Sequence, residues 1–229
     1  MTEAAPAIAL DGLERRYGER AALAGVSLEL PAGATLAVFG ANGAGKTTLL
    51  RILATLLRPH AGHARVLGGS LPRDGWKVRG RIGLLAHDPL LYRELSPREN
   101  LRFHARLHGV PTARIETLLE LVGLAGRGDD PVRTLSRGLA QRVAICRAVL
   151  HEPDLLLLDE PYANLDPAAV EAVSPLVGRA SGCTRVIISH DIEAGLGEAD
   201  LVLGLRDGRQ VLRQVRSAID TATVRELYG

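Results

Sequence analysis

Apolar residues along this chain fall into two kinds of pattern. Up to about Leu36, apolar and polar positions alternate, which predicts β-strands separated by turns at YGER and LPAGA. The short apolar runs TLAVFG, RIGLLAH, DLLLLDEP and TRVIISH predict further strands. Helical periodicity follows the first of these runs and is expected to continue to Pro59, and another helix is expected from about Pro167. Strands that alternate with helices predict an α/β fold with a mainly parallel sheet.

The middle of the chain departs from this alternation. From Ser96 to about Leu150 the periodicity is helical throughout, in SPRENLRFHARLHG, TARIETLLELVGL and LSRGLAQRVAICRAVLH. The last part, which contains LVLGLRDGRQVL, again has the pattern of strands. We therefore expect one domain with a core formed by residues 1–87 and 152–229 and a helical subdomain inserted at about residues 88–151.

Composition and charge exclude several classes of protein. The 229 residues are 46% hydrophobic and 24% charged, as in an ordinary globular domain with a sizeable core. The 28 basic and 26 acidic residues give a net charge of +2, too even to indicate binding to nucleic acid or to an anionic membrane. No apolar run approaches the roughly 18–20 residues that span a bilayer, and MTEAAPAIALDG lacks the features of a signal peptide. We expect membrane association only through a partner, and expect Cys146 and Cys183 to be buried, reduced thiols.

The segment GANGAGKT, Gly40 to Thr47, matches the phosphate-loop pattern G-x-x-x-x-G-K-[ST] between a predicted strand and a predicted helix. Glycines allow such a loop to wrap a phosphate with its backbone N–H groups pointing inward. Lys46 would bring a positive charge to the β- and γ-phosphates, and the Thr47 hydroxyl would bind Mg²⁺. A glycine-rich turn with a surface lysine is the alternative, and the flanking strand and helix argue against it. The residues expected to contact the nucleotide here are Gly40, Ala41, Asn42, Gly43, Ala44, Gly45, Lys46, Thr47 and Thr48.

An acid pair, Asp159 and Glu160, ends the apolar run DLLLLDEP, at the edge where open parallel sheets bind ligands. Asp159 is expected to hold Mg²⁺, and Glu160 to act as the general base that deprotonates an attacking water. His190 ends the run VIISHD at the same edge and is expected to contact the γ-phosphate. Taken alone, both acids could simply end a strand at the surface, and a single histidine is more often structural.

A second candidate anion site is the turn that begins LSRGLAQR. Its Ser-Arg-Gly sequence opens a helix, and the first N–H groups of a helix attract anions. A plain N-capped helix explains the same residues when they are considered in isolation.

Taken in order, Tyr17, GANGAGKT, LSRGLAQR, LLLLDEP, NLD (164–166) and SHD (189–191) resemble the motifs of ATP-binding cassette ATPases over essentially the whole chain. The resemblance implies an α/β, RecA-like P-loop NTPase core with an N-terminal antiparallel β subdomain and an inserted α-helical signature subdomain. It implies ATP and Mg²⁺ as cofactors, Tyr17 stacked on adenine, His190 as the switch histidine, and Asp166 in a loop that crosses to a second subunit.

The resemblance also accounts for two anion sites in one chain. In this family the signature turn binds the γ-phosphate of ATP held by the opposite subunit. Ser136 and Gly138 would therefore complete the site of a partner, which implies a homodimer.

Two motifs depart from the family pattern, at three positions. The signature is usually L-S-G-G-Q, whereas here Arg137 and Leu139 replace Gly and Gln. We expect activity to survive because Ser136 and Gly138 are retained, and Arg137 could add a donor near the partner's nucleotide. His87 stands where the family usually has a glutamine; a neutral imidazole could still bind water or Mg²⁺ there.

The segment AHDPLLYRELSPRENLRFHARLHGV lies where transporter ATPases receive a helix of an integral membrane subunit. This resemblance implies a peripheral protein at the cytoplasmic face of the membrane, most similar to the ATP-binding subunit of the haem exporter of cytochrome c maturation. Drug and polysaccharide exporters share much of the pattern. A soluble cassette ATPase, as in iron–sulphur assembly, is the competing class, and a non-hydrolysing regulator would not need Glu160.

Overall fold

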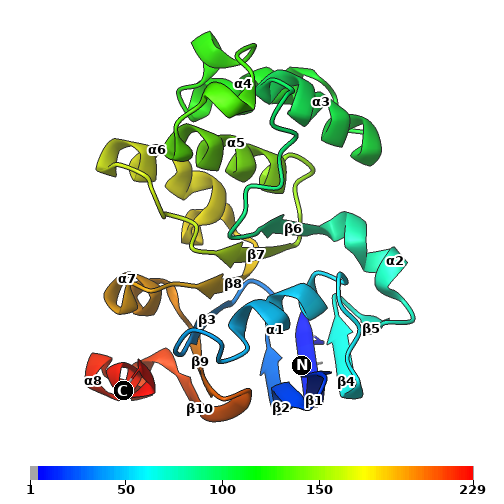
Figure 1. Cartoon of the computed structure of the whole chain (residues 1–229), viewed down its shortest axis with the longest axis vertical. Coiled ribbons are helices and arrows are strands. Elements are labelled where there is room, and N and C mark those ends of the chain that lie inside the picture. The colour runs from blue at the N-terminus through cyan, green and yellow to red at the C-terminus, as the bar shows by residue number, and fades with distance from the viewer. Residues whose placement is uncertain (1–4, 229) are drawn as a thin grey trace.

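The larger of two sheets forms the centre of the molecule. In the computed structural model, which describes residues 5–228, its six strands have the order β10-β9-β3-β8-β7-β6 (Figure 1). All neighbouring strands are parallel except β10, which pairs antiparallel with β9 at one edge. The strands are β3 (Thr35–Phe39), β6 (Ile82–Leu85), β7 (Leu155–Asp159), β8 (Thr184–Ile188), β9 (Leu201–Arg206) and β10 (Arg209–Val215). Every residue of β3, β7 and β8 is buried, which explains why these strands are mostly apolar, with polar or charged residues only at their ends (Thr35, Asp159, Thr184 and Arg185).

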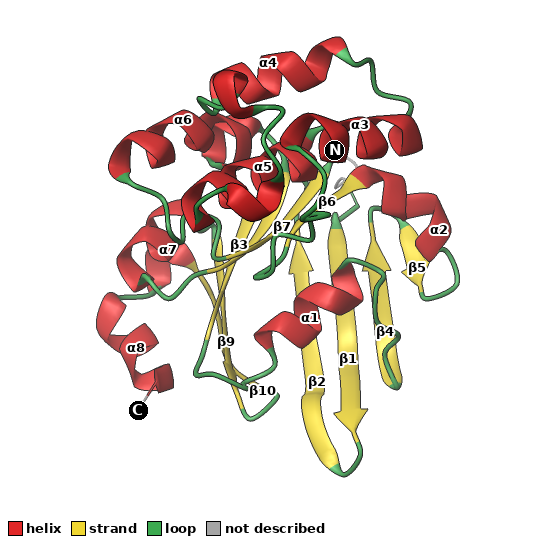
Figure 2. Ribbon diagram, turned by 45° about the horizontal axis from the view of Figure 1, so that its top comes forward, coloured by secondary structure: helices red, strands yellow, loops and turns green. Residues whose placement is uncertain are grey.

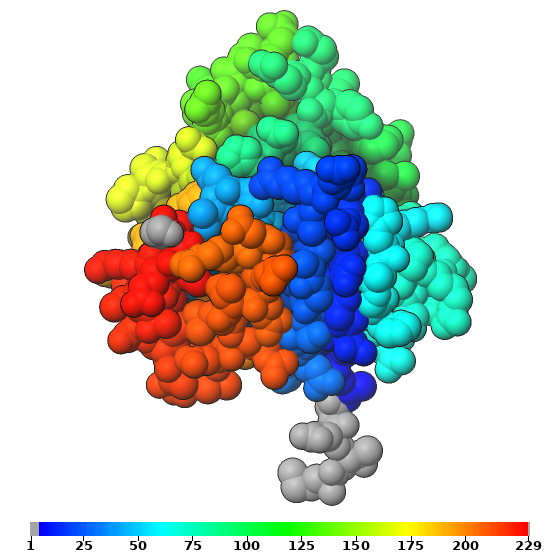
Figure 3. Space-filling model, turned by 60° about the horizontal axis from the view of Figure 1, so that its bottom comes forward, coloured from blue at the N-terminus to red at the C-terminus, as the bar shows by residue number. Residues whose placement is uncertain are grey.

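The second sheet is antiparallel and has the order β2-β1-β4-β5. Its strands are β1 (Ile8–Tyr17), β2 (Arg20–Leu30), β4 (Ala61–Val66) and β5 (Gly69–Leu71). The backbone N–H of Ala24 in β2 donates to the carbonyl of Gly208 at 2.8 Å, which ties this sheet to the turn between β9 and β10. Figure 3 shows the orange β9–β10 segment beside the blue strands of the N-terminal sheet. The phosphate-loop segment between β3 and the next helix therefore lies where the two sheets meet.

Helices cover the sheets and form a separate upper layer (Figure 2). Between β6 and β7 in the sequence come three helices, in which Leu101, Leu119 and Ile145 are fully buried in a core shared with β6, β7, β8 and α6. The helices are α1 (Lys46–Leu53), α2 (Gly75–Val78), α3 (Pro97–His108), α4 (Ala113–Leu121), α5 (Arg137–Val149), α6 (Pro167–Val177), α7 (Ile192–Glu198) and α8 (Thr221–Arg225). The expected α/β architecture, with an N-terminal antiparallel sheet and an inserted helical layer, is confirmed.

Some details differ from the sequence-based expectations. Helix α1 ends at Leu53 rather than Pro59, because Thr55 has a φ of +63°, outside the right-handed helical region. Strands β4 and β5 and helix α2 were not anticipated: β5 and α2 are only three and four residues long, and β4 pairs with β1, which is distant in the sequence. Cys146 is buried as expected, but Cys183 is only partly buried.

Met1 to Ala4 of the stretch considered for a signal peptide lie outside the described residues. Within residues 5–228, no helix is both long and apolar enough to cross a membrane.

Candidate functional site

The loop after β3 has the backbone shape that a phosphate requires. Gly43 and Gly45 have φ angles of +81° and +108°, a region that side chains with a Cβ rarely adopt. A Cβ on Gly45 would lie 2.3 Å from the carbonyl oxygen of Ala22, so β2 approaches the loop too closely for any other residue. Helix α1 begins directly after this glycine, and its first N–H groups therefore point toward the loop.

Lys46 is 7% exposed and folds back over this loop. Its Nζ donates to the carbonyl oxygens of Gly40 and, at 3.1 Å, of Ala41. Burial lowers the pKa of Lys46, and the nearby carboxylates of Asp159 and Glu160 oppose that effect. A positive charge is thus held inside the loop, facing the acidic end of β7.

Thr47 and Asp159 bring two hard oxygen donors together from separate elements. The Thr47 Oγ1 donates to Asp159 Oδ2 at 3.4 Å, a long hydrogen bond between the start of α1 and the end of β7. Asp159 is 6% exposed, and burial raises its pKa, while His87 and the Thr47 hydroxyl act in the opposite direction. A hydroxyl next to a carboxylate is a donor set that suits Mg²⁺.

Glu160 follows β7 with a strained backbone, at a φ of +54°. Its Oε1 is buried and lacks a hydrogen-bond partner among the described residues. His190 Nε2, at the end of β8, lies 3.6 Å from that oxygen. Burial raises the pKa of Glu160, opposed by His190. A buried carboxylate oxygen without a hydrogen-bond partner lowers the stability of a fold. Such an oxygen is instead typical of an active-site group that accepts a proton during the reaction.

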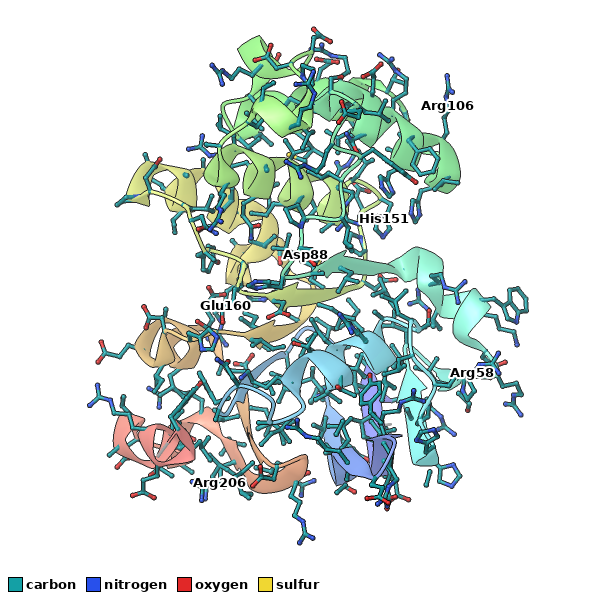
Figure 4. All side chains as sticks on the ribbon, in the orientation of Figure 1. Arg58, Asp88, Arg106, His151, Glu160 and Arg206 are labelled. Atoms are coloured by element: carbon teal, nitrogen blue, oxygen red, sulfur yellow. The ribbon has the colours of Figure 1, made fainter. Side chains whose placement is uncertain are left out.

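A cavity of about 620 Å³ joins these groups. Figure 4 labels Glu160, which follows β7, and Asp88, in the loop after β6. Tyr17 also lines the cavity; it is 47% exposed and has the guanidinium of Arg15 5.1 Å from its ring centroid. The lining consists of Tyr17, Arg20, Ala22, Asn42, Gly43, Gly45, Lys46, Thr47, Thr48, His87, Asp159, Glu160, Ile188 and His190.

Two lining or supporting residues were missed by sequence reasoning. Arg20 reaches the loop from β2, where its Nη2 donates to the carbonyl of Gly43 at 3.3 Å. Gln141 is 6% exposed, and its side-chain amide donates to the carbonyls of Glu160 and Pro161, both at 3.3 Å. Gln141 could have been found from the sequence, because a polar residue on the apolar face of a helix indicates a buried hydrogen bond. Arg20 could not, because no local pattern connects it to Gly43, more than 20 positions away.

The signature residues lie apart from this cavity. Among the described residues, neither Ser136 nor Gly138 lines it. Ser136 caps α5 by accepting from the N–H of Leu139 at 3.3 Å, and is itself exposed. A Cβ on Gly138 would lie 2.6 Å from the carbonyl oxygen of Asn164, so close packing against the NLD loop also requires this glycine.

Asp166 has structural contacts as well. Its side chain caps α6 by accepting from the N–H of Ala169 at 2.8 Å, and it pairs with Arg142 of α5 at 3.3 Å. The NLD loop is thereby attached to the signature helix.

His87 connects the nucleotide cavity to a second one of about 450 Å³, which both Glu160 and Arg137 line. Two of the three positions that depart from the family pattern, His87 and Arg137, thus line one cavity beside the candidate base, whereas Leu139 does not. His87 lies close enough to Asp159 to lower the pKa of that carboxyl.

A phosphate loop with a buried lysine, and an acid pair on a strand of the same parallel sheet, define a P-loop nucleoside triphosphatase. Residues 23–163 match the ABC transporter family. The chain belongs to this family and is an ATP-binding cassette ATPase.

Two relatives illustrate the range of the family. The chain is 41% identical over 213 residues to a daunorubicin resistance ATP-binding protein of Streptomyces coeruleorubidus, covering 90% of this chain and 67% of the relative. It is 42% identical over 184 residues to the cytochrome c biogenesis ATP-binding export protein CcmA of Methylococcus capsulatus, covering 79% of this chain and 89% of the relative.

Among solved structures, the ATP-binding cassette MJ0796, a dimer in a post-hydrolysis state bound to ADP and Pi, matches with a TM-score of 0.82 and 25% identity. The match covers 91% of this chain and 98% of that one. The family and fold expected from the sequence are therefore confirmed.

Proposed function

We propose that this chain is the ATP-hydrolysing subunit of an ABC exporter, working as a homodimer with separate integral membrane subunits at the cytoplasmic face of the membrane. The observation that supports a dimer is that Ser136 and Gly138 do not line the nucleotide cavity formed by the phosphate loop of the same chain. Ser136 is exposed at the start of a 13-residue helix, where a phosphate held by another subunit can approach it.

Each site residue has a role in this proposal. The phosphate loop binds the triphosphate, and Lys46 neutralises its negative charge. Thr47 and Asp159 would hold Mg²⁺, which when bound neutralises charge on the phosphates. The unpaired Oε1 of Glu160 accepts a proton from the attacking water, and His190 holds that carboxylate in place from 3.6 Å.

The remaining site residues orient the nucleotide and join the subunits. Tyr17, which lines the cavity, stacks on the base, with Arg15 on its ring. Asp166 joins the NLD loop to the signature helix through Arg142, so a movement of one is transmitted to the other.

Export is favoured by the relatives. Two relatives with more than 40% identity are a daunorubicin resistance protein and an export protein of cytochrome c biogenesis. The second of these supports haem export as the finer candidate. Co-purification with integral membrane proteins in mild detergent, followed by haem-stimulated ATPase measurement of that complex, tests it; stimulation by anthracyclines and not by haem would contradict it.

The test of the dimer uses Ser136→Arg in a Glu160→Gln background, where slow hydrolysis lets a closed dimer accumulate. The variant should bind ATP as a monomer but fail to dimerise, because the arginine side chain fills the place of the partner's γ-phosphate. Ser217→Arg, an exposed serine in another part of the chain, is the matched control and should dimerise with ATP in sedimentation velocity.

A mixture sharpens the test. Combining a Ser136→Arg chain with a Lys46→Ala chain leaves one intact site per heterodimer, so some ATP-dependent dimer should return. A Ser136→Arg chain that dimerises normally by itself would refute the two-subunit site.

A further inference from the structure

Positive charge is concentrated in one part of this chain. Residues 51–81 contain seven arginines and lysines and a single acid, Asp74, whereas the remaining residues contain 21 basic and 25 acidic side chains. The even balance of the whole chain therefore hides a segment with a net charge of +6 beside a remainder of −4.

Contacts between α1 and α2 hold part of this segment together as one surface. Arg79, in the 3₁₀ turn that continues α2, donates from Nε to Thr55 Oγ1 at 2.9 Å. A Cβ on Gly75 would lie 3.4 Å from the Thr55 side chain, so the start of α2 packs against the residues that follow α1. Figure 4 shows Arg58 on the same side of the molecule as α2. We name this surface the basic face and define it by Leu56, Arg58, Arg73, Trp76, Lys77 and Arg79.

Acidic side chains neutralise only part of it. Asp74 pairs with both Arg73, at 3.2 Å, and Lys77, at 3.1 Å, so one carboxylate is shared by two cations. Arg81 is excluded from the basic face because Asp154 pairs with it at 2.6 Å. Arg58 and Arg79 take part in no ion pair among the described residues, which leaves a net positive surface.

Apolar side chains stand exposed among these charges. Trp76 is 73% exposed, the largest exposed fraction of any large hydrophobic residue described, and Leu56 is 61% exposed. The Lys77 ammonium lies 5.5 Å from the Trp76 ring centroid, so the ring and the cation share one place on the surface. A tryptophan beside a lysine on a surface rich in basic residues is a composition that proteins use at the boundary between lipid headgroups and water.

We propose that the basic face binds directly to an anionic phospholipid bilayer, with Trp76 inserted at the level of the headgroups. The cations attract the phosphate groups of lipid headgroups. Trp76 and Leu56 supply apolar surface that is stabilised by insertion into a bilayer but not by contact with a soluble polyanion. This contact is additional to any integral membrane subunit and requires neither ATP nor a dimer. This proposal goes beyond the expectation that membrane association comes only through a partner, which itself stays a prediction.

The chain contains its own probe, since Trp76 is its only tryptophan. Purified full-length protein is titrated with vesicles of phosphatidylglycerol and phosphatidylcholine, and separately with phosphatidylcholine alone. Anionic vesicles should shift the Trp76 emission to shorter wavelength and sediment the protein, both effects weakening as NaCl is raised. Phosphatidylcholine vesicles should do neither.

Matched charge reversals decide whether the basic face is responsible. Arg58→Glu/Lys77→Glu should weaken vesicle binding at least ~25-fold, because each basic residue near an anionic surface contributes about fivefold. Arg209→Glu/Arg213→Glu changes the net charge equally but lies on β10, at the opposite edge of the large sheet from β6. Figure 4 marks that edge by Arg206, far from Arg58. This control should bind vesicles nearly as well as the original chain, and both variants should retain basal ATPase activity.

Three results would overturn the proposal. The first is no emission shift with anionic vesicles, and the second is an equal loss of binding in both double variants, which would show that only net charge matters. The third is an equal emission shift with heparin or single-stranded DNA that depends on the same residues, which would identify a general polyanion surface. None of these results bears on ATP-driven dimerisation or on co-purification with membrane subunits, so the proposed function is tested separately.

Discussion

Replacing Glu160 with glutamine separates the catalytic from the structural consequences of one buried carboxylate. The amide has nearly the same shape and retains one oxygen, but it cannot take a proton from water. Glu160 sits at a φ of +54°, and its backbone N–H donates to the carbonyl of Ile188 at 3.0 Å, contacts that glutamine keeps. The nucleotide should therefore still bind, since the loop and Lys46 are unchanged.

The expected loss of turnover is at least ~10²-fold, the lower scale for losing a general base, which corresponds to about 2.7 kcal/mol of transition-state stabilisation. The free energy of unfolding, in contrast, should not fall in the Glu160→Gln variant. The pKa of Glu160 is raised by burial above 4.5, so its contribution to stability is complete below that value and is lost as pH rises through the folded-state pKa. Glutamine carries no charge at neutral pH, and Glu160→Gln should therefore be at least as stable as the original chain.

Steady-state ATPase measurement from pH 5 to 9, together with urea unfolding at pH 7, checks both expectations. In the original chain the acidic limb of turnover should lie above pH 4.5 and should be absent from the residual activity of Glu160→Gln. Turnover near the original value would remove Glu160 from the role of base. A variant less stable by more than about 1 kcal/mol would instead show that the ionised carboxylate is stabilised, against the argument from its burial.

Further changes test other parts of the site. Lys46→Ala should lose nucleotide affinity, because the buried charge inside the loop is removed; unchanged affinity in calorimetry would contradict its assignment. His87→Gln should be tolerated, because an amide at this position can bind water or Mg²⁺ as a neutral imidazole can, whereas His87→Ala should weaken Mg²⁺-dependent hydrolysis; identical Mg²⁺ titrations of His87→Ala and the original chain would rule out this role. Glu198 forms an ion pair with Arg185, whose side chain is 1% exposed, against 22% for Glu198. Glu198→Ala leaves the buried Arg185 without this partner and should destabilise the fold by about 3 kcal/mol in urea unfolding, the lower end for breaking a buried pair. Equal stability of that variant and the original chain would refute the estimate.

The sequence alone identified the parts of the site that are built locally. The phosphate loop is one continuous strand–loop–helix, and its shape depends on glycine φ angles that the sequence itself reveals. The acid pair was placed correctly at the end of β7, because a short, wholly apolar run followed by charge has few other interpretations. The cap of α5 was also readable, since the N-capped helix considered for LSRGLAQR is formed by Ser136, which accepts from the N–H of Leu139 three residues later.

Local sequence was less informative where elements are short. The end of α1 was misjudged because the left-handed backbone at Thr55 has no signature in an otherwise helical pattern. The even composition also concealed the basic face, since a total charge contains no information about where charges gather.

Only the tertiary structure decided which distant residues meet. Thr47 and Asp159 are 112 positions apart, and Arg185 and Thr35 are 150 apart, yet each pair is within hydrogen-bond distance. Their encounter depends on the strand order β3-β8-β7, which places the loop after β3 and the acids after β7 at the same sheet edge. Periodicity specifies which face of an element is buried but not which element covers it, because apolar contacts are non-directional. The separation of Ser136 from the phosphate loop has the same origin: the helical layer is positioned by packing and sheet order, which no local motif encodes.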